Sequence, residues 1–183
     1  MRSLIYNEPV QTEQTPQPLK VACDAMCGGV ARWLRVLGVD ASYTPDIGDA
    51  QLVEHAMAEM RIVISADGKL FERRLFTDGS LRGVRLPVGL KLLDQLRFVV
   101  RELGISAGFP RCSLCNGELN AVTRAEIGDV VPARSLIWAR EFYRCGQCGH
   151  VFWEGTHWRR IRAVRDWLIP DAVGGYPPKI APE

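Results

Sequence analysis

Four aspartates stand at or just beyond the predicted ends of strands in this chain. Asp24 closes an apolar run and precedes a turn with two glycines, and Asp67 follows a second apolar run. Asp46 and Asp49 share one loop. Because the carboxyl ends of parallel strands meet at one edge of a sheet, we expect these side chains to converge there. Carboxylates that lie so close repel each other unless a cation neutralises them. Their hard oxygen atoms predict a site for Mg²⁺ or Mn²⁺, which could activate water against a phosphodiester.

Three of these aspartates also fit ordinary structural positions. Asp49 is well placed to cap a helix over residues 50–60. Asp46 follows a proline and Asp67 precedes a glycine, and both are common turn positions. Asp24 is harder to explain in this way, since nothing about the end of a buried strand requires a charge. The pattern alone favours Asp24 as a metal ligand and leaves both interpretations open for the others.

Two CxxC pairs predict a second and different metal site. Four thiolates meet the tetrahedral preference of Zn²⁺ without an open position, so the site is expected to be structural. Residues 116–144 between the pairs leave room for a hairpin or loop, as in a zinc ribbon. Two unrelated pairs of buried thiols are the alternative. The predicted ligands are Cys112, Cys115, Cys145 and Cys148.

A basic segment follows the cysteine pairs. Trp158, Arg159, Arg160 and Arg162 belong to a run over 158–167 with four arginines and two tryptophans. Such a helix suits contact with phosphates and stacking on unpaired bases. The alternative is a solvated helix whose tryptophans pack against the ribbon. The whole chain has a net charge of only +2 at pH 7, so the argument for nucleic acid depends on such local patches.

The spacing of apolar residues predicts strands that alternate with helices, as in βαβ units on a parallel sheet. In the first helix Met26 lies on the apolar face, whereas Arg32 and Arg35 lie off it. Met57 and Met60 lie on the apolar face of the second helix. The predicted strands cover 19–24, 40–44, 61–65 and 83–88, and the predicted helices cover about 26–37, 50–60, 69–76 and 90–103.

The composition is that of a water-soluble globular protein. The chain has 183 residues, of which 47% are hydrophobic and 24% charged, and no stretch reaches the apolar length of a membrane span. The first 20 residues contain no long apolar run, so a standard signal peptide is not expected. We therefore expect a cytoplasmic location, where paired cysteines bind metal rather than form disulfides.

Several stretches together resemble one known family. They are residues 24–28 (DAMCG), 31–38 (ARWLRVLG) and 61–67 (RIVISAD), with Asp46 and Asp49 between them and the two CxxC pairs after them. Over about residues 19–158 the chain resembles the mut-seven C-terminal ribonuclease family, a branch of the PIN-like nucleases. The resemblance implies a PIN-like three-layer α/β/α sandwich with a mostly parallel sheet, followed by a small zinc-ribbon domain.

The resemblance also implies a metal-dependent ribonuclease centre. Its catalytic residues would be Asp24, Asp46, Asp49 and Asp67, with Asp24, Asp49 and Asp67 as ligands of Mg²⁺ or Mn²⁺. The arginines that are candidates for gripping the RNA backbone are Arg32, Arg35, Arg73 and Arg74. The chain departs from the family at Gly29 and Ala66, where a basic residue is usual or frequent, and at Ser65, where threonine is usual.

We therefore expect a flexible lead-in (1–18), a PIN-like nuclease domain (19–108), a zinc ribbon with a basic C-terminal helix (109–168) and a loose tail (169–183). The expected function is hydrolysis of RNA phosphodiester bonds, with the ribbon aiding RNA binding. Candidate partners are tRNA, rRNA and the ribosome, and no membrane partner is expected. One alternative is a non-catalytic or weakly catalytic RNA- or ribosome-binding protein. Another is a different metal-dependent phosphohydrolase on a similar sheet.

Overall fold

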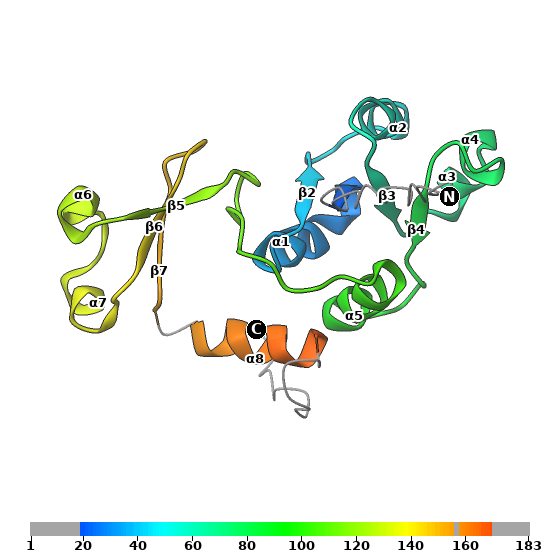
Figure 1. Cartoon of the computed structure of the whole chain (residues 1–183). Helices are drawn as coiled ribbons and strands as arrows, with labels where there is room; N and C mark the ends of the chain where they lie inside the picture. Colours follow the sequence, from blue (N-terminus) through cyan, green and yellow to red (C-terminus); the bar gives the residue numbers. More distant parts are fainter. Residues whose placement is uncertain (1–18, 156–157, 170–183) are drawn as a thin grey trace, which may run out of the picture.

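A four-stranded parallel sheet forms the centre of the molecule. The computed structural model describes residues 19–155 and 158–169, so the expected lead-in 1–18 and nearly all of the expected tail 169–183 lie outside the described residues. All neighbouring pairs in the sheet are parallel, in the order β2-β1-β3-β4. The strands are β1 (Lys20–Cys23), β2 (Asp40–Tyr43), β3 (Ile62–Ser65) and β4 (Gly83–Arg85) (Figure 1). The predicted α/β class with a parallel sheet is confirmed.

The register of the sheet brings the end of β1 beside the end of β3. Cys23 lies opposite Ile64 on one side and opposite Tyr43 on the other. The backbone N–H of Asp24 extends this ladder by donating to the Ile64 carbonyl oxygen at 3.0 Å. The chain goes from β1 to β2 at the sheet edge and then returns past β1 to β3, so the strand order reverses between β1 and β3. Open α/β sheets bind ligands in the crevice outside such a point, and Asp24 stands there.

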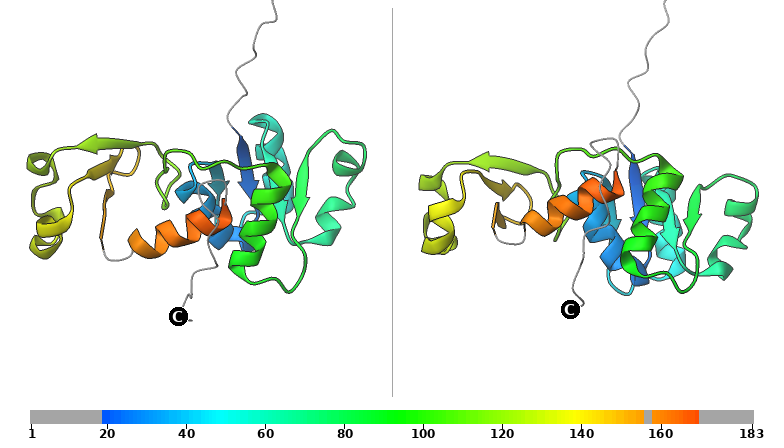
Figure 2. Two further views of the ribbon diagram at one scale, coloured as in Figure 1. Left: turned by 60° about the horizontal axis from the view of Figure 1, so that its bottom comes forward. Right: turned by 90° about the horizontal axis from the view of Figure 1, so that it is seen from below.

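Three helices cover one face of the sheet. They are α1 (Gly28–Val36), α5 (Leu92–Leu103) and α8 (Trp158–Leu168), and Figure 2 shows α5 and α8 side by side. Val164 and Leu168 of α8 are buried in the same apolar core as Leu34 of α1 and Leu96 of α5. The basic helix was expected to belong to the ribbon. Its apolar residues pack instead in the core of the region from β1 to α5, which we call the α/β part.

Two helices pack on the opposite face, with a third short helix beside them. They are α2 (Asp49–Ala58), α3 (Gly68–Phe71) and α4 (Arg74–Thr77). Their core includes Leu52 and Leu70, which pack with Ala22 and Val63 of the strands. A single helix was predicted over 69–76. Two form instead because Arg73 adopts extended backbone, with φ −64° and ψ 143°, between them.

Three methionines that were predicted on apolar helix faces are exposed. Met26 is 73% exposed, Met57 48% and Met60 77%. Met26 lies in a 3₁₀ turn, η1 (Ala25–Cys27), so its direction does not follow the phase of α1. Met60 has a φ of 53° and lies beyond the end of α2. Helix boundaries therefore account for the exposure of Met26 and Met60, whereas Met57 is exposed within α2 itself.

A second, antiparallel sheet follows in the order β5-β6-β7. Its strands are β5 (Leu119–Val122), β6 (Phe142–Cys145) and β7 (Val151–Trp153). Between β5 and β6 the chain forms α6 (Arg124–Ile127), η2 (Gly128–Val130) and α7 (Ala133–Trp138). Ile127 and Val131 of this insertion pack on Phe142 and Val151. The hairpin or loop expected over 116–144 therefore carries short helices and a small core of its own.

None of the helices in the described parts of the chain is both long and apolar enough to cross a membrane.

Candidate functional site

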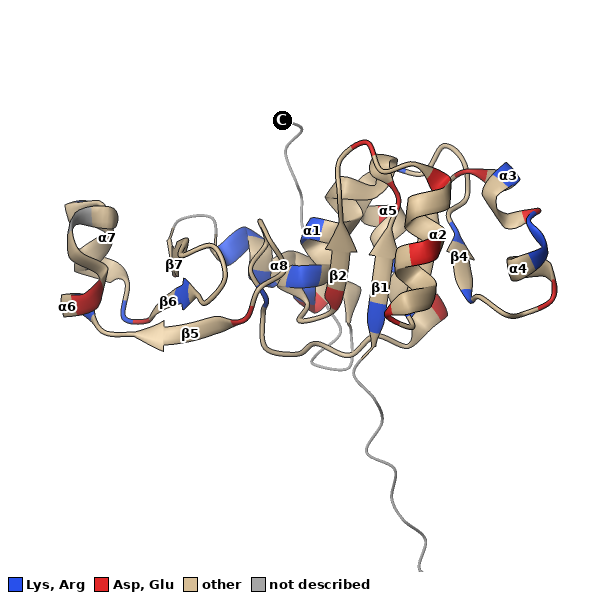
Figure 3. Ribbon diagram, turned by 90° about the horizontal axis from the view of Figure 1, so that it is seen from above, with Lys and Arg blue, Asp and Glu red and all other residues tan. Residues whose placement is uncertain are grey.

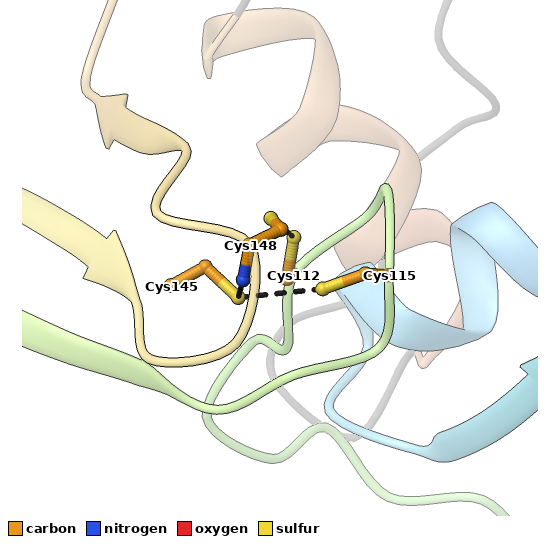
Figure 4. A group of neighbouring side chains, drawn as sticks. All are labelled: Cys112, Cys115, Cys145 and Cys148. Carbon is orange, nitrogen blue, oxygen red and sulfur yellow. Dashed lines mark hydrogen bonds between the residues drawn. The ribbon is translucent and has the colours of Figure 1, made fainter.

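The four cysteine sulfurs converge at one point (Figure 4), and all four Sγ atoms lie within 4.8 Å of one another. Cys112 Sγ is 3.6 Å from Cys148 Sγ, and Cys115 Sγ is 3.4 Å from Cys145 Sγ. A tetrahedral Zn²⁺ with bonds of about 2.3 Å would hold its sulfur ligands about 3.8 Å apart. These donors therefore fit a structural zinc ion, as predicted from the spacing.

Both cysteine pairs lie in tight turns of the same kind. The residue after the second cysteine has a positive φ in each turn, 71° at Asn116 and 72° at Gly149. Each of these residues donates its N–H to the carbonyl oxygen of the first cysteine of its pair, at 2.9 and 3.0 Å. The turns also approach each other closely, because a Cβ at Gly117 would lie 2.7 Å from Cys145 Sγ. Glycine at position 117 therefore makes room for the Cys145 sulfur.

Backbone amides favour the thiolate of Cys145. Burial opposes its ionisation, but the N–H groups of Cys148 and Gln147 and hydrogen bonds from neighbouring thiols lower the pKa of Cys145 to about 6. Burial and the neighbouring sulfurs instead raise the pKa of Cys115 to about 12. Four sulfurs this close cannot all ionise without a cation, so zinc would be the group that relieves their repulsion.

The first cysteine turn is docked on the α/β part through Arg35. This residue is only 4% exposed, and its Nη1 donates to the carbonyl oxygens of Ser113 at 3.2 Å and Leu114 at 3.1 Å. Its Nε donates to the Ala41 carbonyl oxygen at 2.8 Å. The prediction that Arg35 lies off the buried face of α1 is wrong. Because its guanidinium is buried and donates to backbone carbonyl oxygens, Arg35 is also not available to bind the RNA backbone.

Asn116, Asp40 and Arg61 extend this junction. The Asn116 amide donates to Asp40 Oδ1 at 2.7 Å and accepts from the Ala41 N–H at 3.1 Å. Arg61 Nη1 donates to the same Asp40 oxygen at 2.7 Å. Burial alone would raise the pKa of Asp40, but the hydrogen bonds from Arg61 and Asn116 hold it below its usual value. Nothing in the sequence pattern had singled out these three residues.

Asp24 is a buried carboxylate that two donors hold in place. It is 7% exposed, its Oδ1 accepts from the Ala25 N–H at 2.6 Å, and its Oδ2 accepts from the Ser65 hydroxyl. Ser65 Oγ in turn accepts from the Asp67 N–H at 2.9 Å. The serine therefore links the end of β1 to the backbone at the end of β3 and orients the Asp24 carboxylate. At the level of sequence, Ser65 stood out only as a departure from the family pattern.

Tyr43 covers the turn that follows Asp24. Its hydroxyl donates to the Ala25 carbonyl oxygen at 3.1 Å. A Cβ at Gly28 would lie 2.8 Å from that hydroxyl oxygen. Glycine at this position therefore lets the tyrosine ring reach the turn and hold it.

Asp67 and Asp46 occupy the local positions that their neighbours in the sequence suggested. Asp67 Oδ1 accepts from the Lys69 N–H at 2.9 Å and caps α3. Asp46 is exposed in a turn, with a φ of 57°. Asp49, in contrast, is the first residue of α2 rather than its cap, which is Gly48. Capping therefore does not explain Asp49.

The acidic side chains do not close around one point as the cysteines do. Figure 3 shows acidic segments along the edge where β1 and β2 end and where α2 and α3 begin. Asp24 and Asp67 are joined through Ser65, whereas Asp49 Oδ2 lies 3.8 Å from Arg73 Nη2. Among the described residues, the cysteines are the one set of three or more metal-binding side chains whose ligand atoms gather. Ser65 joins the Asp24 carboxylate to the backbone of Asp67, but the expected gathering of the acidic side chains is not seen among the described residues.

Arg85 is a basic residue at this edge that the sequence did not reveal. It is exposed, ends β4 and lies opposite Ser65 in the sheet register. A Cβ at Gly68 would lie 2.6 Å from Arg85 Nη2, so the guanidinium rests against the backbone that follows Asp67. A positive charge therefore stands beside the acidic pair, near Ala66, where the family often has arginine. Arg85 reaches this edge because β4 pairs with β3, so the sequence around Arg85 does not reveal its position.

The other predicted arginines lie on the surface. Arg32 is exposed on α1, and Arg73 and Arg74 are exposed around the start of α4. On α8, Arg159 and Arg160 are exposed, while Arg162 Nη2 donates to Glu154 Oε1 at 2.9 Å. Trp158, below the Arg162 guanidinium, is half-buried. These residues are accessible to a ligand, whereas the buried Arg35 is not.

The fold and the two sites define a class: an α/β protein with an acidic strand edge and a four-cysteine site of zinc-binding type. The model of the Mut7-C RNAse domain family matches residues 19–165, and the chain belongs to this family. It is also similar to the human protein named exonuclease mut-7 homolog, with 32% identity over 102 residues. That match covers 53% of this chain but only 12% of the human protein. Membership in this family indicates a nuclease-related function.

Proposed function

We propose that this protein is a metal-dependent ribonuclease that hydrolyses RNA phosphodiester bonds at the edge where β1 and β3 end. The observation that carries the proposal is the buried Asp24 carboxylate, which Ser65 ties to Asp67 at the point where strand order reverses. A buried charge is costly unless it is hydrogen-bonded and paired; Ala25 and Ser65 supply hydrogen bonds to Asp24, and a bound cation would supply the pairing. The match to an RNAse family supports the same interpretation.

The chemistry of the acidic donors fits Mg²⁺ or Mn²⁺. Asp24, Asp67 and Asp49 offer hard carboxylate oxygens from three neighbouring segments, and we propose that they hold the ion. Their side chains must move to close around it, because they are not gathered as they stand. The bound ion would supply an activated water and positive charge for the phosphate in the transition state. Asp46 then belongs to the exposed turn at the rim of the site.

Other residues of the protein would orient the aspartates and contact the RNA. Ser65 orients the Asp24 carboxylate and fixes the backbone that carries Asp67. Arg85 is placed to contact a phosphate beside Asp67, and Arg73 to contact one beside Asp49. Arg32 and Arg74 are exposed candidates for contacts with the rest of the backbone. The ribbon and the arginines of α8 would bind RNA outside the acidic edge.

The test is cleavage of single-stranded and tRNA-like RNA with Mn²⁺ or Mg²⁺ by the zinc-loaded chain. Cleavage that needs the divalent ion and disappears in Asp67→Asn is expected. RNA left intact at every ion concentration, by folded protein, would contradict the proposal.

A second candidate function is supported by the open acidic set. A protein whose carboxylates are not gathered and whose basic helix is exposed could bind RNA or a ribosome without cutting it. Intact RNA together with tight binding that weakens steeply as salt rises would favour this alternative.

A further inference from the structure

A cavity of about 310 Å³ opens between the ribbon and α8. The segment before the first cysteine turn, strands β6 and β7, and the start of α8 all contribute to its walls. None of the four predicted catalytic aspartates lines it. Its volume is at the lower end of the range for small-molecule sites, about 300–1,000 Å³. The cavity is therefore separate from the acidic edge.

Aromatic rings form much of the wall. Phe109 and Tyr143 meet edge to face, with ring centroids 5.4 Å apart and an interplanar angle of 66°. Phe152, Trp153 and Trp158 also line the cavity. Phe109 is 60% exposed, so one of its ring surfaces is open to a ligand. Flat aromatic surfaces of this kind favour the stacking of a planar ring.

Polar groups are interspersed with the rings. The indole Nε1 of Trp158 is buried and has no hydrogen-bond partner among the described residues. Because this nitrogen is closed to solvent, a ligand does not reach it, and the polar groups open to a ligand belong to other side chains. Glu141 and Arg165 supply further acceptor and donor groups to the same lining. Donors and acceptors beside stacking surfaces match the edges and faces of a nucleobase.

Charged side chains near the cavity further limit the class of ligand that it could bind. Arg159 and Arg160 are exposed on the helix that also carries Trp158 into the cavity wall. Guanidinium groups beside a stacking pocket favour a base that is attached to phosphate over an uncharged flat molecule. The lining itself is balanced in charge, with Arg111 and Arg165 against Glu141 and Glu154, so the cavity suits an uncharged base and the phosphate contacts would come from the exposed arginines of α8.

We propose that this cavity binds one unstacked nucleobase of single-stranded RNA while the arginines of α8 contact the adjoining phosphates. This proposal rests on the proposed function, because it takes RNA to be the substrate. A base held here would fix the distance along the strand between the ribbon and the acidic edge. Cleavage would then require an unpaired nucleotide at a set distance from the bond that is cut.

The test uses the full zinc-loaded chain with Asp24→Asn as the parent, so that bound RNA is not consumed. Binding is measured for a single-stranded RNA and for versions that lack one base at each position in turn. Phe109→Leu removes an exposed ring, and Trp158→Phe keeps an aromatic ring of smaller area in the wall. Trp138→Leu is the matched control, since Trp138 is 80% exposed on α7 and does not line the cavity.

We expect Phe109→Leu to weaken binding of intact RNA about tenfold. Trp158→Phe should weaken it less, and Trp138→Leu should bind like the parent. Removal of the bound base from the RNA should weaken binding by the parent about as much as Phe109→Leu weakens binding of intact RNA. On the RNA that lacks this base, Phe109→Leu should cause no further loss of affinity. Folding of each variant is checked by its zinc content and its unfolding midpoint.

The other results separate this proposal from the nuclease. Binding that is unchanged in both cavity variants would overturn the base site and leave the ribonuclease standing. Base-dependent binding with no cleavage by wild type would support the base site and overturn the ribonuclease. No RNA binding by the folded parent would overturn the base site, while the ribonuclease is judged by cleavage with wild type.

Discussion

The guanidinium of Arg35 donates a hydrogen bond of 3.1 Å to the carbonyl oxygen of Leu114, inside the first cysteine turn. Arg35 belongs to α1, and the turn belongs to the cysteine site. The same side chain also bonds to Ala41 at β2. The cysteine site is therefore built into the α/β part rather than tethered to it, and its metal should influence the stability of both.

The first prediction concerns this junction. Arg35→Met should lower the free energy of unfolding by about 2–4 kcal/mol, because it removes the donor to the buried Ala41 carbonyl oxygen and to two part-buried ones. Arg32→Met, one turn away on the exposed side of α1, should change it by no more than about 0.5 kcal/mol. Urea unfolding of the zinc-loaded proteins measures both. Equal stability of the two variants would show that the junction is not structural.

The second prediction concerns zinc. Elemental analysis of gently purified protein should find about one zinc per chain. Removal of the ion by a chelator, or Cys112→Ser, should lower the unfolding midpoint of the α/β part as well as of the ribbon, since Arg35 and Asn116 join the two. Retention of zinc should fall in acid because the thiolates must be deprotonated to bind it. Protein that is folded equally well without metal would contradict this prediction.

The third prediction concerns pH. Arg61 and Asn116 hold the pKa of Asp40 below its usual value, so the carboxylate stabilises the fold above its unfolded pKa of about 4. That stability is lost as pH falls through the lower pKa of the folded state. Asp40→Asn should cost about 1–3 kcal/mol at neutral pH, and the difference from wild type should shrink below about pH 4. The exposed Asp94→Asn is the control, and a pH-independent difference would contradict the prediction.

The fourth prediction concerns Arg85. Arg85→Gln should raise the KM for RNA and lower cleavage by about tenfold, because the lost charge lies beside Asp67. Arg82→Gln should cleave like wild type, since Arg82 precedes β4 and lies at the opposite end of that strand. Steady-state kinetics at fixed salt measure both variants. An equal loss in the two would indicate a general charge effect.

Apolar spacing predicted the order of strands and helices because each element buries one face on the same sheet. It failed at Met26 and Met60, where a 3₁₀ turn and a left-handed residue change the direction of the side chain. Arg35 could not be recognised because its partner, Leu114, lies 79 residues away. The roles of Ser65 and Arg85 depend on strand register, which the sequence around each residue does not reveal. The cysteine site was predictable because two local turns carry all of its ligands.

The most direct test of the central claim is cleavage by Asp24→Asn, with Glu102→Gln as the control carboxylate at the end of α5. Both are purified with full zinc content and assayed on the same RNA with Mn²⁺ or Mg²⁺. Asp24→Asn should lose activity by on the order of 100-fold or more, while Glu102→Gln cleaves like wild type. Equal cleavage by all three proteins would contradict the account, because the activity would not belong to the site at the end of β1.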